Sequence, residues 1–145
     1  MRVSAIAPTF AANAFPGKGC SMRIISTSSA PSPVAAYSQA IEAGGLVFTA
    51  GQVGSDPAGG ALPDDVDSQA ELCFTNIAAI LREAGLGYAD VAKVTMFLTD
   101  MAQFATVNRV YERYVGNHRP ARTTVGVVAL PRGALIEVEA IAIRR

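Results

Sequence analysis

Apolar side chains recur at intervals of three and four residues over one stretch in the middle of the chain. Asp64 or Asp65 can cap a helix at the start of this stretch, and Gly85 stands where a helix would end. The recurring apolar positions are Ala70, Cys73, Ile77, Ile80, Leu81 and Ala84. Since this spacing gathers them on one face, it predicts a helix with one buried side.

A second helix is predicted after Asp100, whose carboxylate can cap its first turn. Its apolar stripe consists of Phe104, Val107, Tyr111 and Tyr114. Two amphipathic helices of similar length are enough to cover one face of a sheet.

Five runs that are apolar or alternate in polarity predict strands. They are "MRIIS" (22–26), "LVFTA" (46–50), "VAKVTMFL" (91–98), "TTVGVVA" (123–129) and "ALIEVEAIAI" (134–143). Gly51 is expected to break the second strand. The segment "SAPSPVAAYSQA" (29–40) is predicted to be an extended loop, because Pro31 and Pro33 bias the residues before them away from helix.

The last two strands flank "LPRG" (130–133), which has the length of a hairpin turn, so they are expected to pair antiparallel. The order strand, strand, helix, strand, helix, strand, strand predicts an α+β domain with a mixed sheet and two helices on one face. The other apolar face then needs a partner. A homo-oligomer with its sheets packed inward is therefore expected.

Charged residues interrupt these last two apolar runs. The period of two places Glu137 and Glu139 on one face of their strand, and Arg122 and Thr124 share a face of the strand before it. On the pattern alone, Arg122 has its head in water and the glutamates lie on a solvated face. The alternative is a site in which an arginine binds a small carboxylate and a glutamate activates water.

The composition indicates one domain and excludes several kinds of function. Half of the 145 residues are hydrophobic and 17% are charged. Acids and bases balance over the whole chain, but Met22 onward carries a net charge of −2, and no basic patch is visible before the terminal Arg144 and Arg145. Nucleic-acid binding is therefore not expected.

The residue types that bind metals are sparse. Cys20 and Cys73 form no CxxC pair, and Cys73 falls on the first helical stripe as a buried thiol. His118 is the only histidine and is expected to be exposed in a loop. Neither a metal site nor a disulfide framework is predicted.

The first 21 residues contain no acid and are interpreted as an N-terminal extension before a domain at 22–145. Ala12-Asn13-Ala14 only faintly suggests a signal-peptide cleavage site, because Pro8 interrupts a short apolar run. No stretch reaches the length of a membrane span. A cytoplasmic protein is expected, or an organellar one if the extension is a transit segment.

Five segments carry a family resemblance, in order, from about Met22 to Arg145. They are "APSPVAAYSQA", "GLVFTAGQVG", "DVAKVTMFLTDMAQFATVNRVYERY", "PARTTV" and "ALIEVEAIAIRR". They resemble the successive signatures of the RidA (YjgF/YER057c/UK114) family, the reactive-intermediate deaminases. The resemblance implies a homotrimer of chorismate-mutase-like subunits, each with a six-stranded sheet, two outer helices and sites between subunits.

The resemblance also implies an activity without a cofactor. In its best-known branch the family hydrolyses 2-iminopropanoate, 2-iminobutanoate and their enamine tautomers, released by pyridoxal-phosphate enzymes, to 2-keto acids and ammonium. By matching position, Arg122 resembles the arginine that binds the substrate carboxylate, and Glu137 resembles the glutamate that positions water. Tyr37, Gly51 and Asn108 resemble the remaining cleft residues.

Two positions depart from the family pattern. Thr124 stands where the deaminase branch commonly has Cys, and is included among the substrate-binding positions. Ala50 stands where that branch commonly has Ser, which removes a hydrogen bond of about 1 kcal/mol. The alternatives to the deaminase are an endoribonuclease, as some relatives have been described, and a binder of small carboxylates or keto acids that turns nothing over.

Overall fold

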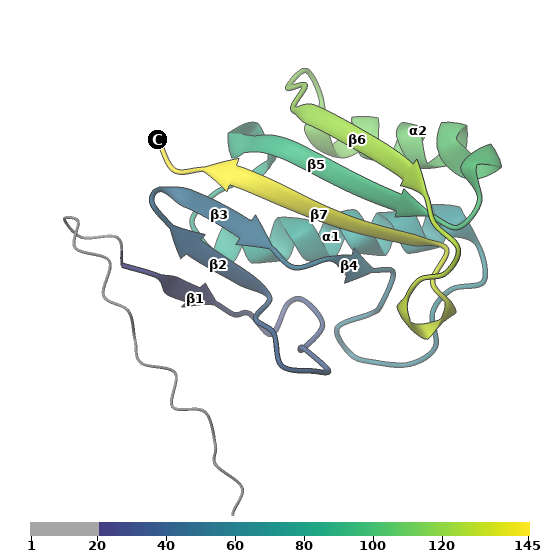
Figure 1. The fold of residues 1–145 in the computed structure, drawn as a ribbon, viewed down its shortest axis with the longest axis horizontal. Helices are drawn as coiled ribbons and strands as arrows, with labels where there is room; N and C mark the ends of the chain where they lie inside the picture. The colour runs from purple at the N-terminus through teal and green to yellow at the C-terminus, as the bar shows by residue number, and fades with distance from the viewer. Residues whose placement is uncertain (1–20) are drawn as a thin grey trace, which may run out of the picture.

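The computed structural model describes residues 21–145, which form one mixed sheet and two helices (Figure 1). The strands are β1 (Arg23–Ile25), β2 (Ala40–Ala43), β3 (Leu46–Thr49), β4 (Gln52–Val53), β5 (Val91–Leu98), β6 (Ala121–Gly126) and β7 (Ile136–Ile143). The helices are α1 (Val66–Glu83) and α2 (Phe104–Val115), with three short 3₁₀ turns, η1 (Tyr88–Asp90), η2 (Met101–Gln103) and η3 (Pro131–Gly133). The expected α+β class with a mixed sheet is confirmed. The suggested cleavage site at 12–14 lies outside the described residues, and the extension over 1–21 stays a prediction.

The strand order is β1-β2-β3-β7-β5-β6, and β4 pairs with β7 beside this path. Both β3 and β4 run antiparallel to β7, with Phe48 opposite Ile141 and Gln52 opposite Val138. They are two pieces of one strand that is interrupted at Gly51, as expected from the sequence. The sheet therefore has seven strands, or six when these two pieces are counted together.

The predicted hairpin between the last two strands is wrong. β6 pairs in parallel with β5, while β7 pairs antiparallel with both β3 and β5, so β5 separates β6 from β7. Helix α2 returns the chain from the end of β5 to the start of β6, as parallel pairing requires. The segment after β6 leads into η3 instead of a tight hairpin turn. A turn signal shows that the chain reverses, but it does not say which strand the next one pairs with.

Strand β2 was not predicted. It follows the proline-rich loop directly, and Glu42 interrupts its short apolar pattern. It pairs antiparallel with β3 across Gly44 and Gly45, whose φ angles of 59° and 78° lie in the left-handed region. Two glycines between extended runs are typical of a two-residue hairpin, and that signal could have found the strand.

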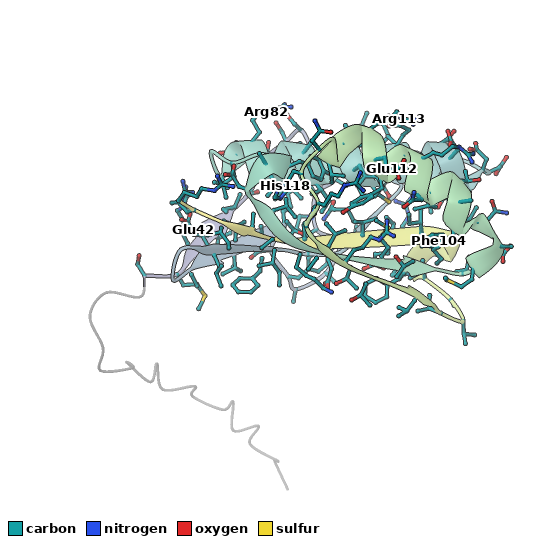
Figure 2. The ribbon with its side chains drawn as sticks, turned by 90° about the horizontal axis from the view of Figure 1, so that it is seen from above. Glu42, Arg82, Phe104, Glu112, Arg113 and His118 are labelled. Atoms are coloured by element: carbon teal, nitrogen blue, oxygen red, sulfur yellow. The ribbon has the colours of Figure 1, made fainter. Side chains whose placement is uncertain are left out.

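Both helices pack on the same face of the sheet, as predicted (Figure 2). The six predicted apolar positions of α1 are all buried, as are alternate residues of β7 from Ile136 to Ala142. Asp65 caps α1 by accepting a hydrogen bond from the Ser68 amide at 2.8 Å. Asp100 caps η2, which leads into α2.

The opposite face of the sheet carries Glu137 and Glu139 together with apolar side chains. Phe48, Val125 and Ile143 are between 38% and 44% exposed, whereas Val47 and Ala142, which point to the helices, are buried. None of the described helices lies over this face (Figure 2). Within the described part of the chain, no helix is long and apolar enough to cross a membrane.

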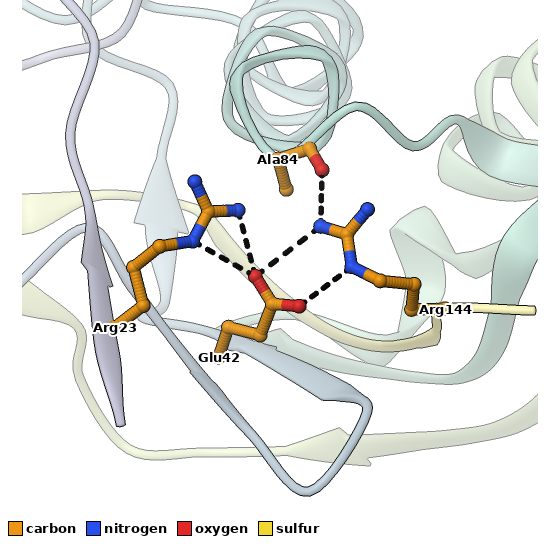
Figure 3. Close-up of polar contacts among 4 residues, drawn as sticks. All are labelled: Arg23, Glu42, Ala84 and Arg144. Atoms are coloured by element: carbon orange, nitrogen blue, oxygen red, sulfur yellow. Dashed lines mark hydrogen bonds and ion pairs between the residues drawn. The ribbon is translucent and has the colours of Figure 1, made fainter. Parts of the chain in front are cut away.

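A network of ion pairs at the surface ties the two ends of the described chain together (Figure 3). The Glu42 carboxylate accepts hydrogen bonds from Arg23 at 2.7 Å and from Arg144 at 2.6 Å. Arg144 also donates to the Ala84 carbonyl at the end of α1. The hydrogen bonds from these two arginines, Arg144 first, lower the pKa of Glu42 to about 2.

Candidate functional site

The predicted site residues fall into two groups on opposite faces of the sheet. Tyr37, Gly51 and Glu137 border one pocket of about 290 Å³. Arg122 and Asn108 border a second hollow beside α2, and Thr124 lies on the same face of β6 as Arg122. We call the first the carboxylate pocket and the second the arginine hollow.

Glu137 projects from β7 into the carboxylate pocket, because its neighbours Ile136 and Val138 point to the helices. Gly51 lies directly against it: a Cβ atom at position 51 would stand 1.9 Å from Glu137 Oε1. A side chain cannot fit there without moving the carboxylate. Gly51 therefore does more than permit a bend in the strand.

The environment of Glu137 favours its protonated form. Partial burial raises the pKa of its carboxyl group, and the negative charge of Glu139 two residues along the strand raises this pKa further. A raised pKa makes a carboxylate a stronger base near neutral pH, which suits a group that takes a proton from water.

Tyr37 reaches the carboxylate pocket from the proline-rich loop, and its side chain is 48% exposed. The loop is held by the buried side chain of Gln39. Its Nε2 donates to the carbonyls of Thr27, Ala30 and Pro31, and its Oε1 accepts from the Thr27 amide at 2.6 Å. These bonds fix a segment that has little regular structure of its own.

Arg122 lies at the start of β6 with its guanidinium against two aromatic rings of α2. Its Cζ atom is 5.2 Å from the centre of the Phe104 ring and 5.0 Å from that of Tyr111. Nη1 donates to Asn108 Oδ1 at 2.6 Å. Asn108 Nδ2 in turn donates to Glu112 Oε1 at 2.9 Å. Burial raises the pKa of Tyr111, and the nearby Arg122 charge opposes that rise.

Thr124 follows Arg122 by two residues and lies opposite Met96 of β5. Its Oγ1 atom is buried and has no hydrogen-bond partner among the described residues.

A single copy of the chain does not bring Arg122 and Glu137 together. Arg122 is level with Val94 of β5, on the face that the helices cover, whereas Glu137 is level with Phe97 on the open face. The sheet itself separates the two side chains. A ligand bound to both must therefore contact residues of two copies.

Cys73 and His118 lie outside both the carboxylate pocket and the arginine hollow. Burial raises the pKa of the Cys73 thiol, which lies fully inside the core. His118 was expected to be exposed, but it is half-buried, and its Nε2 lies 2.6 Å from the Val91 carbonyl. Residues 21–145 contain no group of three or more His, Cys, Asp or Glu side chains that could hold a metal ion.

Several site residues were missed by the sequence analysis. Arg132 borders the carboxylate pocket from η3 with a φ angle of 60°, and it was interpreted only as part of a hairpin turn. Phe104 and Tyr111 were assigned to the core stripe, although they also contact Arg122. Glu112 was overlooked, but its position four residues after Asn108 is a recognisable helical pair.

Comparison with known proteins gives matches over nearly the whole described chain. The profile of the family described as endoribonuclease L-PSP matches residues 27–144. A RutC family protein of Pyrococcus abyssi is 47% identical over 120 residues, which cover 82% of this chain and 94% of the relative. The 2-iminobutanoate/2-iminopropanoate deaminase of Salmonella typhimurium is 42% identical over 126 residues, which cover 85% of this chain and 98% of the relative. The crystal structure of E. coli TdcF with bound serine aligns with a TM-score of 0.81 at 41% identity, covering 85% of this chain and 99% of that one.

The fold and these matches define a class of small α+β proteins with two helices on one face of a mixed sheet. The chain belongs to the RidA (YjgF) family, whose profile carries the description endoribonuclease L-PSP.

Proposed function

We propose that this protein hydrolyses reactive 2-imino acids and their enamine tautomers to 2-keto acids and ammonium, without a cofactor. Two observations support the proposal: Arg122 is held by Asn108 and by two aromatic rings in the arginine hollow, and Glu137 lies with a raised pKa in the carboxylate pocket on the other face of the sheet. Relatives in Salmonella typhimurium and Rattus norvegicus, both 42% identical, are named 2-iminobutanoate/2-iminopropanoate deaminase. These names give the substrate class of the proposal.

In the proposed mechanism Arg122 binds the carboxylate of the imino acid by two parallel hydrogen bonds. This contact orients the C=N carbon and excludes uncharged imines. Glu137 holds a water molecule and accepts a proton from it as the water oxygen bonds to that carbon. The imine nitrogen takes up a proton as water adds, which gives a carbinolamine. Glu137 returns its proton to that nitrogen, the C–N bond breaks as the hydroxyl group loses its proton, and ammonia leaves a 2-keto acid, so that one water is consumed for each ammonia released. Tyr37, Asn108 and Thr124 contact the substrate, and Gly51 makes room for the Glu137 carboxylate.

We propose further that the active form is a homotrimer of chorismate-mutase-like subunits, with each site formed between two copies. The exposed apolar side chains of the open sheet face, including Phe48 and Ile143, support contact with another copy. The division of the site residues supports it independently, because the arginine hollow of one copy needs the carboxylate pocket of its neighbour. The cytoplasm is the proposed location.

The test of this function is an imine hydrolysis assay. A dehydratase acting on serine generates 2-aminoacrylate, and the rate of keto-acid formation is followed with and without the protein. We expect the protein to accelerate the reaction and Arg122→Ala to abolish most of the acceleration. No acceleration by the wild type, or full activity in Arg122→Ala, would contradict the proposal.

The description of the matched family names an endoribonuclease, so RNA cleavage is the second candidate. The net charge of −2 from Met22 onward disfavours it. Incubation with labelled RNA across a salt series separates the two activities. A protein that is stabilised by keto acids but does not accelerate hydrolysis would instead be a binder of small carboxylates.

A further inference from the structure

Glu112 lies outside the set of residues that would touch a substrate, but it is joined to that set by hydrogen bonds. Asn108 Nδ2 donates to Glu112 Oε1 at 2.9 Å, and Arg122 Nη1 donates to Asn108 Oδ1 at 2.6 Å. The three side chains therefore form a continuous line from the surface of α2 to the arginine of β6. Figure 2 shows Glu112 on α2, along the same helix as Phe104.

The amide of Asn108 has one end that donates and one end that accepts, and the two ends have nearly the same shape. Packing alone does not decide which end faces Arg122. A guanidinium can only donate and an ionised carboxylate can only accept. Between Arg122 and Glu112, the amide is satisfied in one orientation alone, with oxygen toward the arginine.

The same helix also fixes the plane of the guanidinium. The rings of Phe104 and Tyr111 approach the Arg122 Cζ atom at 5.2 and 5.0 Å, so the group is held by cation–π contacts as well as by the amide. Among the described residues Arg122 forms no ion pair, and its other donors remain free for an incoming carboxylate. A guanidinium binds a carboxylate through two parallel hydrogen bonds, so its plane must be oriented toward the ligand.

From these contacts we infer that Glu112 is a positioning residue: it sets the orientation of the Asn108 amide and thereby aims Arg122 at the substrate carboxylate. The inference about substrate rests on the proposed function, whereas the inference about Arg122 orientation does not. Loss of Glu112 frees the amide to turn its NH₂ group toward a cation. Affinity for carboxylates falls as a result, without any change in the residues that touch them.

The experiment compares Glu112→Ala, Glu112→Gln and Glu112→Lys with the wild type. Calorimetry measures the Kd for 2-oxobutanoate, and the imine assay measures KM and kcat. Glu112→Ala is expected to raise the Kd about five- to tenfold, because it removes one hydrogen bond from a charged network. In the imine assay the change should appear mainly as a higher KM, with kcat little altered. Glu112→Gln keeps an acceptor and restores affinity to within about twofold. Glu112→Lys offers only donors, so it weakens binding more than Ala does.

Two controls separate positioning from general damage to α2. Glu71→Ala removes the contacts of Glu71 with Arg113 and Tyr114, which tie α2 to α1 away from Asn108, and should leave the Kd unchanged. In an Asn108→Ala background the Glu112→Ala change should have no further effect, because its intermediary is missing. Equal losses in both backgrounds would overturn the inference.

An NMR measurement of Arg122 Nε–Hε mobility, assigned with Arg122→Lys, needs neither ligand nor turnover. Greater mobility in Glu112→Ala than in the wild type supports the positioning role, and unchanged mobility overturns it. If the wild type neither binds 2-oxobutanoate nor hydrolyses imines, the proposed function fails, and the NMR result still decides the role of Glu112.

Discussion

Gly51 shows how the size of one residue constrains the proposed site. Because a Cβ atom there would lie 1.9 Å from Glu137 Oε1, Gly51→Ala must displace the carboxylate. We expect kcat in the imine assay to fall by about tenfold or more, since displacements of about 1 Å can cost two orders of magnitude. Gly87→Ala is the matched control, because a Cβ atom at position 87 meets nothing within 4 Å. Equal activity of both variants would contradict the proposed role of Glu137.

The ionised side chain of Glu137 should lower the stability of the fold at neutral pH while it serves as the base of the proposed reaction. Its pKa is raised in the folded state, so it favours folding most below the ordinary value of 4.5 and loses this contribution as pH rises through the raised value. Glu137→Gln removes the cost of the ionised group at neutral pH. We expect a higher Tm at pH 7 than the wild type and a rate lower by about 10²- to 10⁴-fold. A lower Tm with retained activity would show that the carboxylate is structural.

Where one face of an element is buried, the sequence pattern correctly predicted to which side of that element each side chain points. The alternation in β7 separated Glu137 and Glu139 from Ile136 and Val138, and the structure confirms this separation. What Arg122 contacts was not predictable in the same way. Arg122 contacts the rings of Phe104 and Tyr111 and the amide of Asn108, all on α2. These contacts depend on how the helix packs against the sheet, which the period of apolar residues does not encode.

At the scale of elements, the Glu42 network should make stability depend on pH in acid. The pKa of Glu42 is lowered from 4.5 to about 2, so its ionised form stabilises the fold fully above pH 4.5, and this contribution is lost as pH falls through about 2. Glu42→Gln should have a lower Tm than the wild type at pH 7, and the two should converge at pH 2. Thermal unfolding followed by circular dichroism measures both.

Glu83→Gln is the control for this comparison, because the Glu83 side chain has no hydrogen bond among the described residues. It should follow the wild type at both pH values. A difference between Glu42→Gln and the wild type that persists at pH 2 would mean that shape, and not charge, holds β1, β2 and the C-terminal segment together.

The helices and most strands follow from local pattern, whereas the pairing of the strands does not. The caps at Asp65 and Asp100 and the stripe of α1 are encoded within a few residues of one another. Strand β7 lies between β3 and β5, and β3 is about a hundred residues away from β7 in the sequence. The local turn signal at 130–133 carries no information about such a distant strand, so it led to the wrong pairing partner for β7. Local sequence pattern therefore predicted the helices and most strands, but not the order in which the strands pair.

For the whole molecule, we propose that each site combines Arg122 of one copy with Glu137 of another. The site residues were predicted from the resemblance to a family, and the structure places them on two faces of one sheet. No inspection of one chain's sequence shows which of them come from the same copy. A neighbouring copy packed in this way would also cover the apolar side chains that are exposed on the open sheet face of a single chain.

The most direct measurement is complementation between two inactive variants. Arg122→Ala and Glu137→Gln are purified separately, mixed in equal amounts, unfolded and refolded together, and the imine hydrolysis rate is measured. If sites form between neighbouring copies in a closed ring, about a quarter of the sites regain both residues, and about a quarter of the wild-type activity returns. If the mixture is no more active than the two variants refolded apart, while refolded wild type is active, the shared site is contradicted.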